Sequence, residues 1–256
     1  MEKFGKSQSV SRVEDQRFLT GQGRYVDDIA PEGALYAYVL RSPVAHGEIV
    51  ELDVEGAREV EGVHLVLTAQ DLAQAGMNEG MAFNTVRNRD GSEAAAPRRP
   101  ILAEGRVRFV GEPVAMLVAE NLETARDAAE AILLDIDDLP VKTEIGPGGT
   151  PLHNEAPDNR AFDWALGDEA VVEAAIKDAA HVVRLPLHDN RIIANPMEPR
   201  GCYAEIEGER LHVCVNGQGV WGTKGNLARV LNMQAGDIRV TTPDVGGGFG
   251  TKAMEI

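Results

Sequence analysis

Cysteine is scarce in this 256-residue sequence, which contains only Cys202 and Cys214. They form neither a CxxC pair nor a cluster with histidine of the kind that binds zinc, and two thiols are too few for an iron–sulfur cluster. We expect both to be buried free thiols in a reducing compartment, although their spacing alone leaves a disulfide between them open.

Positive charge and long apolar runs are also lacking. Lysine and arginine number 25 against 41 aspartates and glutamates, and the net charge of -16 argues against binding to nucleic acid. No run of about 18 apolar residues is present to span a membrane, and residues 1–18 have no apolar core of signal-peptide length. The cytoplasm is therefore the expected location. Contents of 43% hydrophobic and 26% charged residues are typical of a globular protein with one large or two ordinary domains.

The first half of the sequence contains most of the strand-like runs. Their composition predicts strands at 35–40, 49–54, 63–67, 107–110 and 113–118. Asn121 is placed to cap a helix that we expect to continue to about Asp135. Its apolar stripe would comprise Leu122, Ala125, Ala129, Ile132 and Leu133. These elements predict a small α/β unit over residues 18–145. Residues 73–100 interrupt it with a long stretch of low periodicity, which is a functional loop, an interface loop or poorly ordered.

A linker rich in proline and glycine, residues 146–163, separates this unit from the second half. Asp168 is then placed to cap a helix. The apolar face of that helix would comprise Val171, Val172, Ala175, Ile176 and Ala179. Strands are predicted at 181–187, 201–206, 211–215 and 238–242, with a helix over about 220–231. We expect residues 164–256 to be a mixed α/β domain that stops unfinished.

The stretch DVGGGFGTK at residues 244–252 is unusual because four of its residues within five positions are glycine. Glycine permits positive φ and lets a backbone approach a ligand closely. The spacing does not match a phosphate-binding P-loop, since the glycines crowd in front of Thr251 and Lys252. A dinucleotide GxGxxG motif would require a third glycine at Thr251. A tight structural turn between a strand and a helix remains an alternative.

Several longer motifs accompany this loop in a collinear order. The first half contains RFLTGQGRYVDDI (17–29), LYAYVLRSPVAHGEI (35–49) and VRFVGEPVAMLVAENLETARDAAEAI (107–132). The second half contains NPMEPRGCYAEI (195–206), VNGQGVWGTKGNLARVL (215–231) and GGGFGTK (246–252). Together they resemble the large subunit of the molybdenum hydroxylases, the group of xanthine dehydrogenase, aldehyde oxidase and aerobic carbon monoxide dehydrogenase. The resemblance covers most of the chain.

The resemblance implies an α+β fold with an α/β-hammerhead domain at 18–145, the linker at 146–163 and the first, incomplete part of a molybdopterin-binding domain at 164–256. It also implies roles for particular residues. Gln218 matches the family residue whose amide hydrogen-bonds an oxygen ligand of molybdenum, a role that suits an uncharged donor.

Other family roles fall on the glycine loop. Phe249 matches the residue whose backbone lies beside the metal, so Phe249 and Gln218 would surround molybdenum without ligating it. Gly247, Gly248 and Gly250 match the segment that contacts the pterin, where a side chain would hold the backbone away.

Two further residues and the histidines complete the candidates. Glu198 and Arg200, in MEPRG, match the substrate side of the family's pocket, and an ion pair with a purely structural role is an equal alternative. His46 is expected to pack in the hammerhead. The remaining histidines have no ligand-like spacing: His64, His153, His181, His188 and His212.

The resemblance also implies what the sequence does not contain. The family's catalytic base is a glutamate near the C-terminal end of a much longer chain, so no catalytic residue is expected within this one. The implied cofactor is molybdenum–molybdopterin, for which the cytosine dinucleotide form is one option. The implied partners are the remainder of the large subunit or a second chain carrying it, an iron–sulfur small subunit with 2Fe–2S clusters, and a medium subunit with FAD.

Two hypotheses follow for function. The first is a molybdopterin-binding portion of a molybdenum hydroxylase that, when complete, oxidises an aldehyde, an N-heterocycle or carbon monoxide with a water-derived oxygen. The second is a catalytically inactive fragment or a partner-binding remnant of that subunit. Under either hypothesis we expect the isolated chain to retain no molybdenum cofactor and to oxidise nothing.

Overall fold

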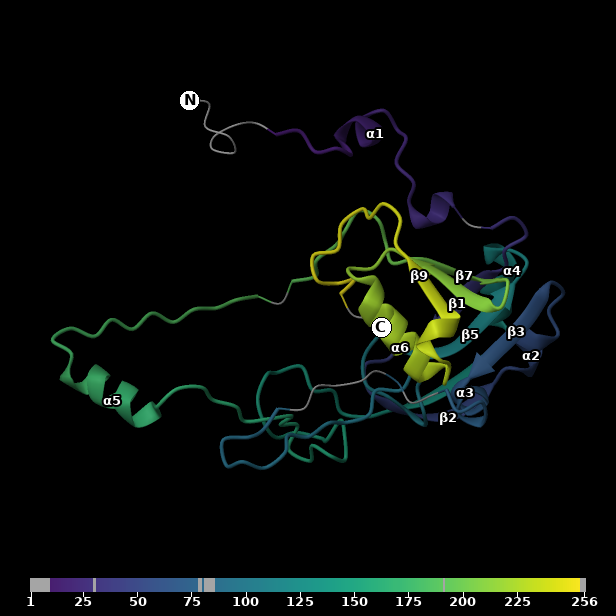
Figure 1. Ribbon diagram of the computed structural model, residues 1–256. Coiled ribbons are helices and arrows are strands. Elements are labelled where there is room, and N and C mark those ends of the chain that lie inside the picture. The colour runs from purple at the N-terminus through teal and green to yellow at the C-terminus, as the bar shows by residue number, and fades with distance from the viewer. Residues whose placement is uncertain (1–9, 30, 78–79, 81–85, 191, 254–256) are drawn as a thin grey trace, which may run out of the picture. The chain divides into compact units, whose positions relative to one another are not determined.

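The computed structural model describes residues 10–29, 31–77, 80, 86–190 and 192–253 (Figure 1). These form two compact units. The first unit is Ala34–Ile193 with residues 229–232. The second combines the described parts of Met1–Gly33 and Met233–Glu255 with Ala194–Ala228. Segments from both ends of the sequence therefore belong to one unit.

One sheet of the first unit has a buried central strand. Strand β5 (Pro113–Ala119) lies between β1 (Tyr36–Arg41) and β3 (Val63–Thr68), and both pairings are antiparallel. Its run of small and branched apolar residues fits this central place, because Val114 and Leu117 are completely buried. All three strands match the sequence predictions within a residue or two.

Helix α4 (Leu122–Glu130) packs on β1 and β5. The Asn121 side chain accepts a hydrogen bond of 2.8 Å from the backbone N–H of Thr124, which confirms the predicted cap. The helix buries small side chains, Ala125 and Ala128. Small side chains allow the helix to approach the sheet closely and complete its core.

The predicted continuation of this helix to Asp135 is wrong. Helix α4 ends at Glu130, and Leu133–Asp138 forms strand β6 instead. The alternating sequence LLDIDD suits a half-buried strand, and β6 pairs antiparallel with β2 (Gly47–Asp53). A second sheet results, in the order β4-β2-β6. Its third strand, β4 (Arg106–Val107), is shorter than the run predicted at 107–110.

Short helices and loops complete the first unit. Helix α2 (Glu55–Arg58) precedes β3, and α3 (Ala69–Gln74) follows it. The linker 146–163 contains no helix or strand. Part of the predicted loop 73–100 lies outside the described residues, and the part from residue 86 onward has an isolated bridge between Arg87 and Glu93.

Helix α5 (Glu169–Asp178) lies between two extended stretches of chain (Figure 1). The Asp168 side chain accepts a hydrogen bond from Val171 N–H, so this predicted cap is confirmed. The predicted strand 181–187 is wrong, because the structure assigns no strand there. The run alternates like a strand, but no strand in the described part of the chain pairs with it, and every residue in it is exposed.

The second unit is built on one sheet with order β7-β8-β9. Strands β7 (Cys202–Glu207) and β8 (Arg210–Val215) form an antiparallel hairpin. Strand β9 (Ile238–Thr241) lies parallel to β8. Between β8 and β9 runs helix α6 (Val220–Val230), so these three elements form a βαβ crossover. The strands and the helix agree with the sequence predictions.

Short helical segments complete the second unit: α1 (Asp15–Leu19), η1 (Val26–Asp28) and η2 (Ala235–Asp237). Cys214 and Ile238 are buried in the sheet. Both cysteines are free thiols, but Cys202 is exposed, so the expectation that both are buried is wrong for Cys202. Among the described strands, β7 pairs with β8 alone, which leaves Cys202 near an open edge. No helix in the described part of the chain is long and apolar enough to cross a membrane.

Candidate functional site

The glycine-rich loop 244–252 begins two residues after β9 and has a strained backbone. Gly247 and Gly250 have φ of 101° and 84°, values that glycine adopts easily. Phe249, between Gly248 and Gly250, has φ of 49°, which is unusual for a bulky residue. Its side chain is 75% exposed, so burial in the described structure does not offset the strain. Strain of this kind concentrates at functional sites.

Two of the glycines are required by close packing. A Cβ at Gly246 would lie 2.5 Å from Glu198 Cβ. A Cβ at Gly248 would lie 2.6 Å from both Cδ and Oε1 of Gln218. Both distances are shorter than real Cβ contacts, so a side chain at either position would displace Glu198 or Gln218 from the loop. The structure thus brings together three of the regions singled out in the sequence.

Gln218 holds the far end of the loop through its carbonyl oxygen. Oε1 accepts hydrogen bonds from the backbone N–H groups of Gly250 at 2.9 Å and Lys252 at 3.2 Å. The backbone N–H of Gln218 donates to the Lys252 carbonyl at 2.9 Å. Gln218 is exposed, and no acceptor for its Nε2 amino group occurs among the described residues. The amide is therefore oriented by the loop with both of its N–H donors available.

Glu198 holds the near end of the loop. Its Oε2 accepts from Gly246 N–H at 2.7 Å and from Lys252 Nζ at 2.9 Å. The side chains of Glu198 and Lys252 are 14% and 1% exposed. Burial raises the pKa of Glu198, but the Asn216 side chain, the Gly246 N–H and the Lys252 ammonium together lower it below its ordinary value. Glu198 is therefore ionised at neutral pH.

The other carboxylate oxygen of Glu198, Oε1, differs from Oε2 in its hydrogen bonding. Oε1 is buried and lacks a hydrogen-bond partner of normal geometry among the described residues. A buried carboxylate oxygen without a partner is costly and uncommon. Glu198 Oε1 is therefore an acceptor beside the loop.

Asp244 anchors the start of the loop to the N-terminal segment of the same unit. Its carboxylate pairs with the Arg17 guanidinium through both oxygens and also accepts from Arg24 N–H at 2.7 Å. The hydrogen bond from Arg17, and then that from Arg24, lower the pKa of Asp244. The loop is thus fixed at its start by Asp244 and at its end by the contacts of Lys252.

The candidates on the predicted substrate side separate in the structure. Glu198 pairs with Lys252, whereas the exposed Arg200 donates to the backbone carbonyl of Thr251. An ion pair between Glu198 and Arg200, the alternative considered from the sequence, is not among the salt bridges of the described residues. Sequence reasoning missed Lys252 as the partner. The available signal was a lone lysine directly after a glycine loop that matches no phosphate motif.

Asp244 and Arg17 were also missed, although both lie inside quoted motifs. The two residues are 227 positions apart, so no local pattern connects them. A pairing of this kind becomes visible only when the chain is folded.

The histidines lie away from this loop's contacts. His46 is 1% exposed and its Nδ1 hydrogen-bonds the Pro140 carbonyl at 2.8 Å, which confirms its expected packing role. His212 bridges Glu205 and Thr241 within the sheet, at 2.9 and 2.8 Å. Among the described residues, no group of histidine, cysteine and carboxylate side chains could hold a metal ion.

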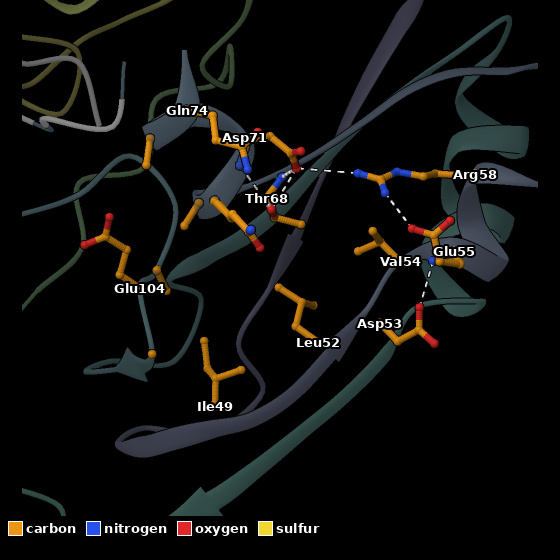
Figure 2. Close-up of a pocket in the computed structure, with 15 residues that line it drawn as sticks. Ile49, Leu52, Asp53, Val54, Glu55, Arg58, Thr68, Asp71, Gln74 and Glu104 are labelled. Carbon is orange, nitrogen blue, oxygen red and sulfur yellow. Dashed lines mark hydrogen bonds and ion pairs between the residues drawn. The ribbon is translucent and has the colours of Figure 1, made fainter. Parts of the chain in front are cut away.

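A cavity of about 710 Å³ lies in the first unit, beside β2 and α3 (Figure 2). Its polar walls are already paired: Arg58 contacts Glu55 at 2.6 Å and Asp71 at 3.5 Å, and Asp71 also caps α3 through Thr68. Asp53 accepts from the Glu55 N–H. Because these groups satisfy one another, the cavity does not indicate a ligand.

Comparison with known proteins places both halves of the chain. Residues 20–140 match the family model described as "Aldehyde oxidase and xanthine dehydrogenase, a/b hammerhead domain". Residues 152–256 match the model described as "Molybdopterin cofactor-binding domain". The chain is 39% identical to the nicotine 6-hydroxylase large subunit of Paenarthrobacter nicotinovorans, over 95% of this chain and 30% of that protein. It is 30% identical to the carbon monoxide dehydrogenase large chain of Hydrogenophaga pseudoflava, over 93% and 31%.

Solved structures give the same result. Quinoline 2-oxidoreductase from Pseudomonas putida 86 superposes with a TM-score of 0.78 at 34% identity, over 96% of this chain and 31% of that one. Carbon monoxide dehydrogenase from Oligotropha carboxidovorans superposes with a TM-score of 0.80 at 27% identity, over 96% and 32%. The chain therefore spans about 30% of the length of these relatives.

Proposed function

Because the chain belongs to the molybdenum hydroxylase large-subunit family, as its N-terminal portion, we propose that it supplies one wall of a molybdopterin pocket. In this proposal it acts with the polypeptide that its relatives carry beyond the matched region. The completed subunit would oxidise an aldehyde, an N-heterocycle or carbon monoxide with a water-derived oxygen. The base for that reaction would come from the completing polypeptide, so we assign no catalytic residue within this chain.

The observation that carries the proposal is the junction between Gln218 and the glycine loop. The loop presents backbone at positive φ, and substitution of Gly246 or Gly248 would collide with its neighbours. Gln218 is held through its oxygen, which leaves its amino group as a donor. An exposed, oriented donor beside permissive backbone fits a large polar cofactor that must approach closely.

Within the proposal each loop residue has a role. Backbone at Gly247, Gly248 and Gly250 would contact the pterin, and the cytosine dinucleotide form of molybdopterin is one that we consider. Gln218 would donate from Nε2 toward an oxygen on molybdenum, and Phe249 would bring its strained backbone beside the metal. The bound cofactor would supply two-electron oxidation chemistry. The residues of this chain bind it, orient it and exclude water from its face.

We place Glu198 and Arg200 on the substrate side of that pocket. The buried Oε1 of Glu198 supports this, because it has no hydrogen bond of normal geometry with a described residue, although the Asn216 side chain is close enough to lower the pKa of the carboxyl group. Oε2 remains committed to Lys252 and Gly246. Arg200 is exposed and attached to the loop by a single backbone contact, so its guanidinium retains donors for a ligand.

The need for a completing polypeptide is supported by exposed apolar residues around α5. Every residue from 161 to 190 is exposed. The apolar face predicted for α5 includes Val171, Val172 and Ile176, which are 63%, 53% and 42% exposed. Exposed apolar surface of this extent is typical of an interface. We assign its cover to the remainder of the large subunit, whether it continues this chain or is a second chain.

Further partners follow by analogy with the relatives, which are named as large subunits or large chains. We propose that a small subunit with 2Fe–2S clusters and a medium subunit with FAD carry the electrons away. The free thiols of Cys202 and Cys214 support the cytoplasm as the location, because such pairs persist in a reducing compartment.

The test is to purify this chain from cells that make the molybdenum cofactor, alone and co-expressed with the complementary remainder of the nicotine 6-hydroxylase large subunit. We expect no molybdenum in the chain alone and bound molybdenum in the co-purified complex. Gln218→Ala should lower the metal content, whereas Gln234→Ala, an exposed glutamine in the same unit, should not. A complex that forms without molybdenum would favour the inactive, partner-binding remnant instead.

A further inference from the structure

A second, smaller pocket in the first unit has basic groups on apolar walls. It encloses about 290 Å³, and its apolar walls are Pro97, Pro100 and Phe109. The charged and titratable residues that line it are Arg98, Arg99, Arg108, Glu112 and His153. Such a basic concentration is unexpected in a protein with a net charge of -16. None of these residues belongs to the glycine-loop site.

Two guanidinium groups at this pocket form no ion pair with a carboxylate of the described residues. Arg108 donates from Nε to the Leu152 carbonyl at 3.0 Å and from Nη1 to the Arg106 carbonyl at 3.2 Å, and both acceptors are neutral. The Arg99 guanidinium lies over the Phe109 ring, 5.8 Å from its centroid, and forms no salt bridge with a described residue. Stacking of this kind orients a guanidinium while leaving its edge free for an anion.

The remaining charges at the pocket are already committed. Arg98 pairs with Glu104 at 2.7 Å. Glu112 is 5% exposed, and its carboxylate accepts from the backbone N–H of Arg108. Arg99 and Arg108 together outweigh the single Glu112 carboxylate, so the pocket keeps a net positive charge.

His153 also lines the pocket, and the charges around it shift its pKa. Burial lowers the pKa of His153, the positive charge of Arg108 lowers it further and His46 adds to this, whereas Glu155 raises it. Glu112 is the acidic residue that lines the pocket itself. An imidazole in this position is neutral at neutral pH, so it does not add repulsion and can hydrogen-bond.

We propose that this pocket binds a small organic anion, a carboxylate or a phosphate attached to a flat apolar body. Its charged end meets Arg99 and Arg108, since guanidinium groups match carboxylate and phosphate oxygens in geometry. Its apolar body lies against Phe109, Pro97 and Pro100. The volume suits a molecule of about one aromatic ring, at the lower end of ligand pockets.

The test uses the full chain and follows the His153 ring by NMR during titration with benzoate. We expect saturable shifts and a rise in the His153 pKa, because a bound anion stabilises the imidazolium. Phenol has the ring without the charge, and inorganic phosphate has the charge without the ring, so each should bind more weakly. Phenyl phosphate in place of benzoate distinguishes the two anion classes. Absence of saturation by both aryl anions, or equal binding of phenol, would overturn the proposal.

A matched pair of variants locates the binding. Arg99→Gln should weaken benzoate binding about tenfold or more, the scale of a lost charge-assisted hydrogen bond. Arg126→Gln removes the same charge from an exposed position on α4 and should leave binding unchanged. Equal weakening in both would show a general charge effect and contradict the assignment. Should Arg99→Gln fail to fold, the comparison of benzoate with phenol on the unaltered chain still decides the question.

Discussion

Replacement of Lys252 by methionine tests whether the buried ion pair holds the glycine loop. The Lys252 side chain is 1% exposed and that of Glu198 is 14% exposed, so the pair is largely removed from water. Removal of one partner from a buried pair costs about 3–5 kcal/mol, because the remaining charge is uncompensated. Glu198 retains some solvent contact, so we expect about 3 kcal/mol. That is a large fraction of the roughly 5–15 kcal/mol typical of a domain.

The change of stability with pH gives a second test of this prediction. In the native chain the pKa of Glu198 lies below 4.5, so the ionised carboxylate stabilises the fold above that pH, and this contribution is lost as the pH falls through the lowered pKa. Without the ammonium, two contributions that lower the folded-state pKa of Glu198 are lost, so that pKa should rise. The native chain then loses more stability than the variant as the pH falls, so the deficit of the variant should shrink in acid.

The assay is urea unfolding followed by circular dichroism, together with amide hydrogen exchange of peptides covering 238–253. Lys224→Met is the control, because Lys224 lies on α6 over Trp221 and forms no salt bridge with a described residue. The double variant Glu198→Gln/Lys252→Met should be more stable than Lys252→Met alone, since it leaves no buried charge unpaired. The reasoning fails if Lys252→Met costs no more than Lys224→Met, or if its deficit grows in acid.

Three further predictions concern the same loop. Gly248→Ala should destabilise the second unit by about 1–3 kcal/mol in urea unfolding, because the new methyl group displaces Gln218 and breaks its two hydrogen bonds. The control is Gly225→Ala on α6, where a methyl group meets open space, and this change should be neutral or stabilising. Phe249→Gly should raise stability by about 1 kcal/mol, because it relieves positive φ at an exposed side chain, and an unchanged or lower midpoint would contradict this. Asp244→Asn should speed amide exchange in the loop at neutral pH, and in the native chain the same loss should appear as the pH falls through the lowered pKa of Asp244.

Local signals predicted the helix starts and most strands. Asn121 and Asp168 cap helices as expected, because a cap is a hydrogen bond to a residue three positions away. Strands β1, β3 and β5 follow from short apolar runs, whose burial needs little beyond their own composition. The incorrect predictions concern segments whose structure depends on pairing with another strand. Leu133 extends the apolar stripe of α4 in sequence, yet it begins a strand because β2 offers an open edge there.

The opposite error at 181–187 has the same cause. Its alternation is that of a strand, but a strand requires a partner for its backbone groups, and none pairs with it among the described residues. Composition and alternation identify a strand-like run, but they do not show whether a second strand lies beside it to pair with its backbone.

The sequence by itself determined the family and the conformationally permissive loop, because glycine content and collinear motifs are local properties. Only the tertiary structure decided how that loop is held. Lys252 meets Glu198 across 54 positions, and Arg17 meets Asp244 across 227. Such contacts depend on where the sheet and its crossover place each segment, and the donors that they bring to Glu198 keep its carboxylate ionised despite burial.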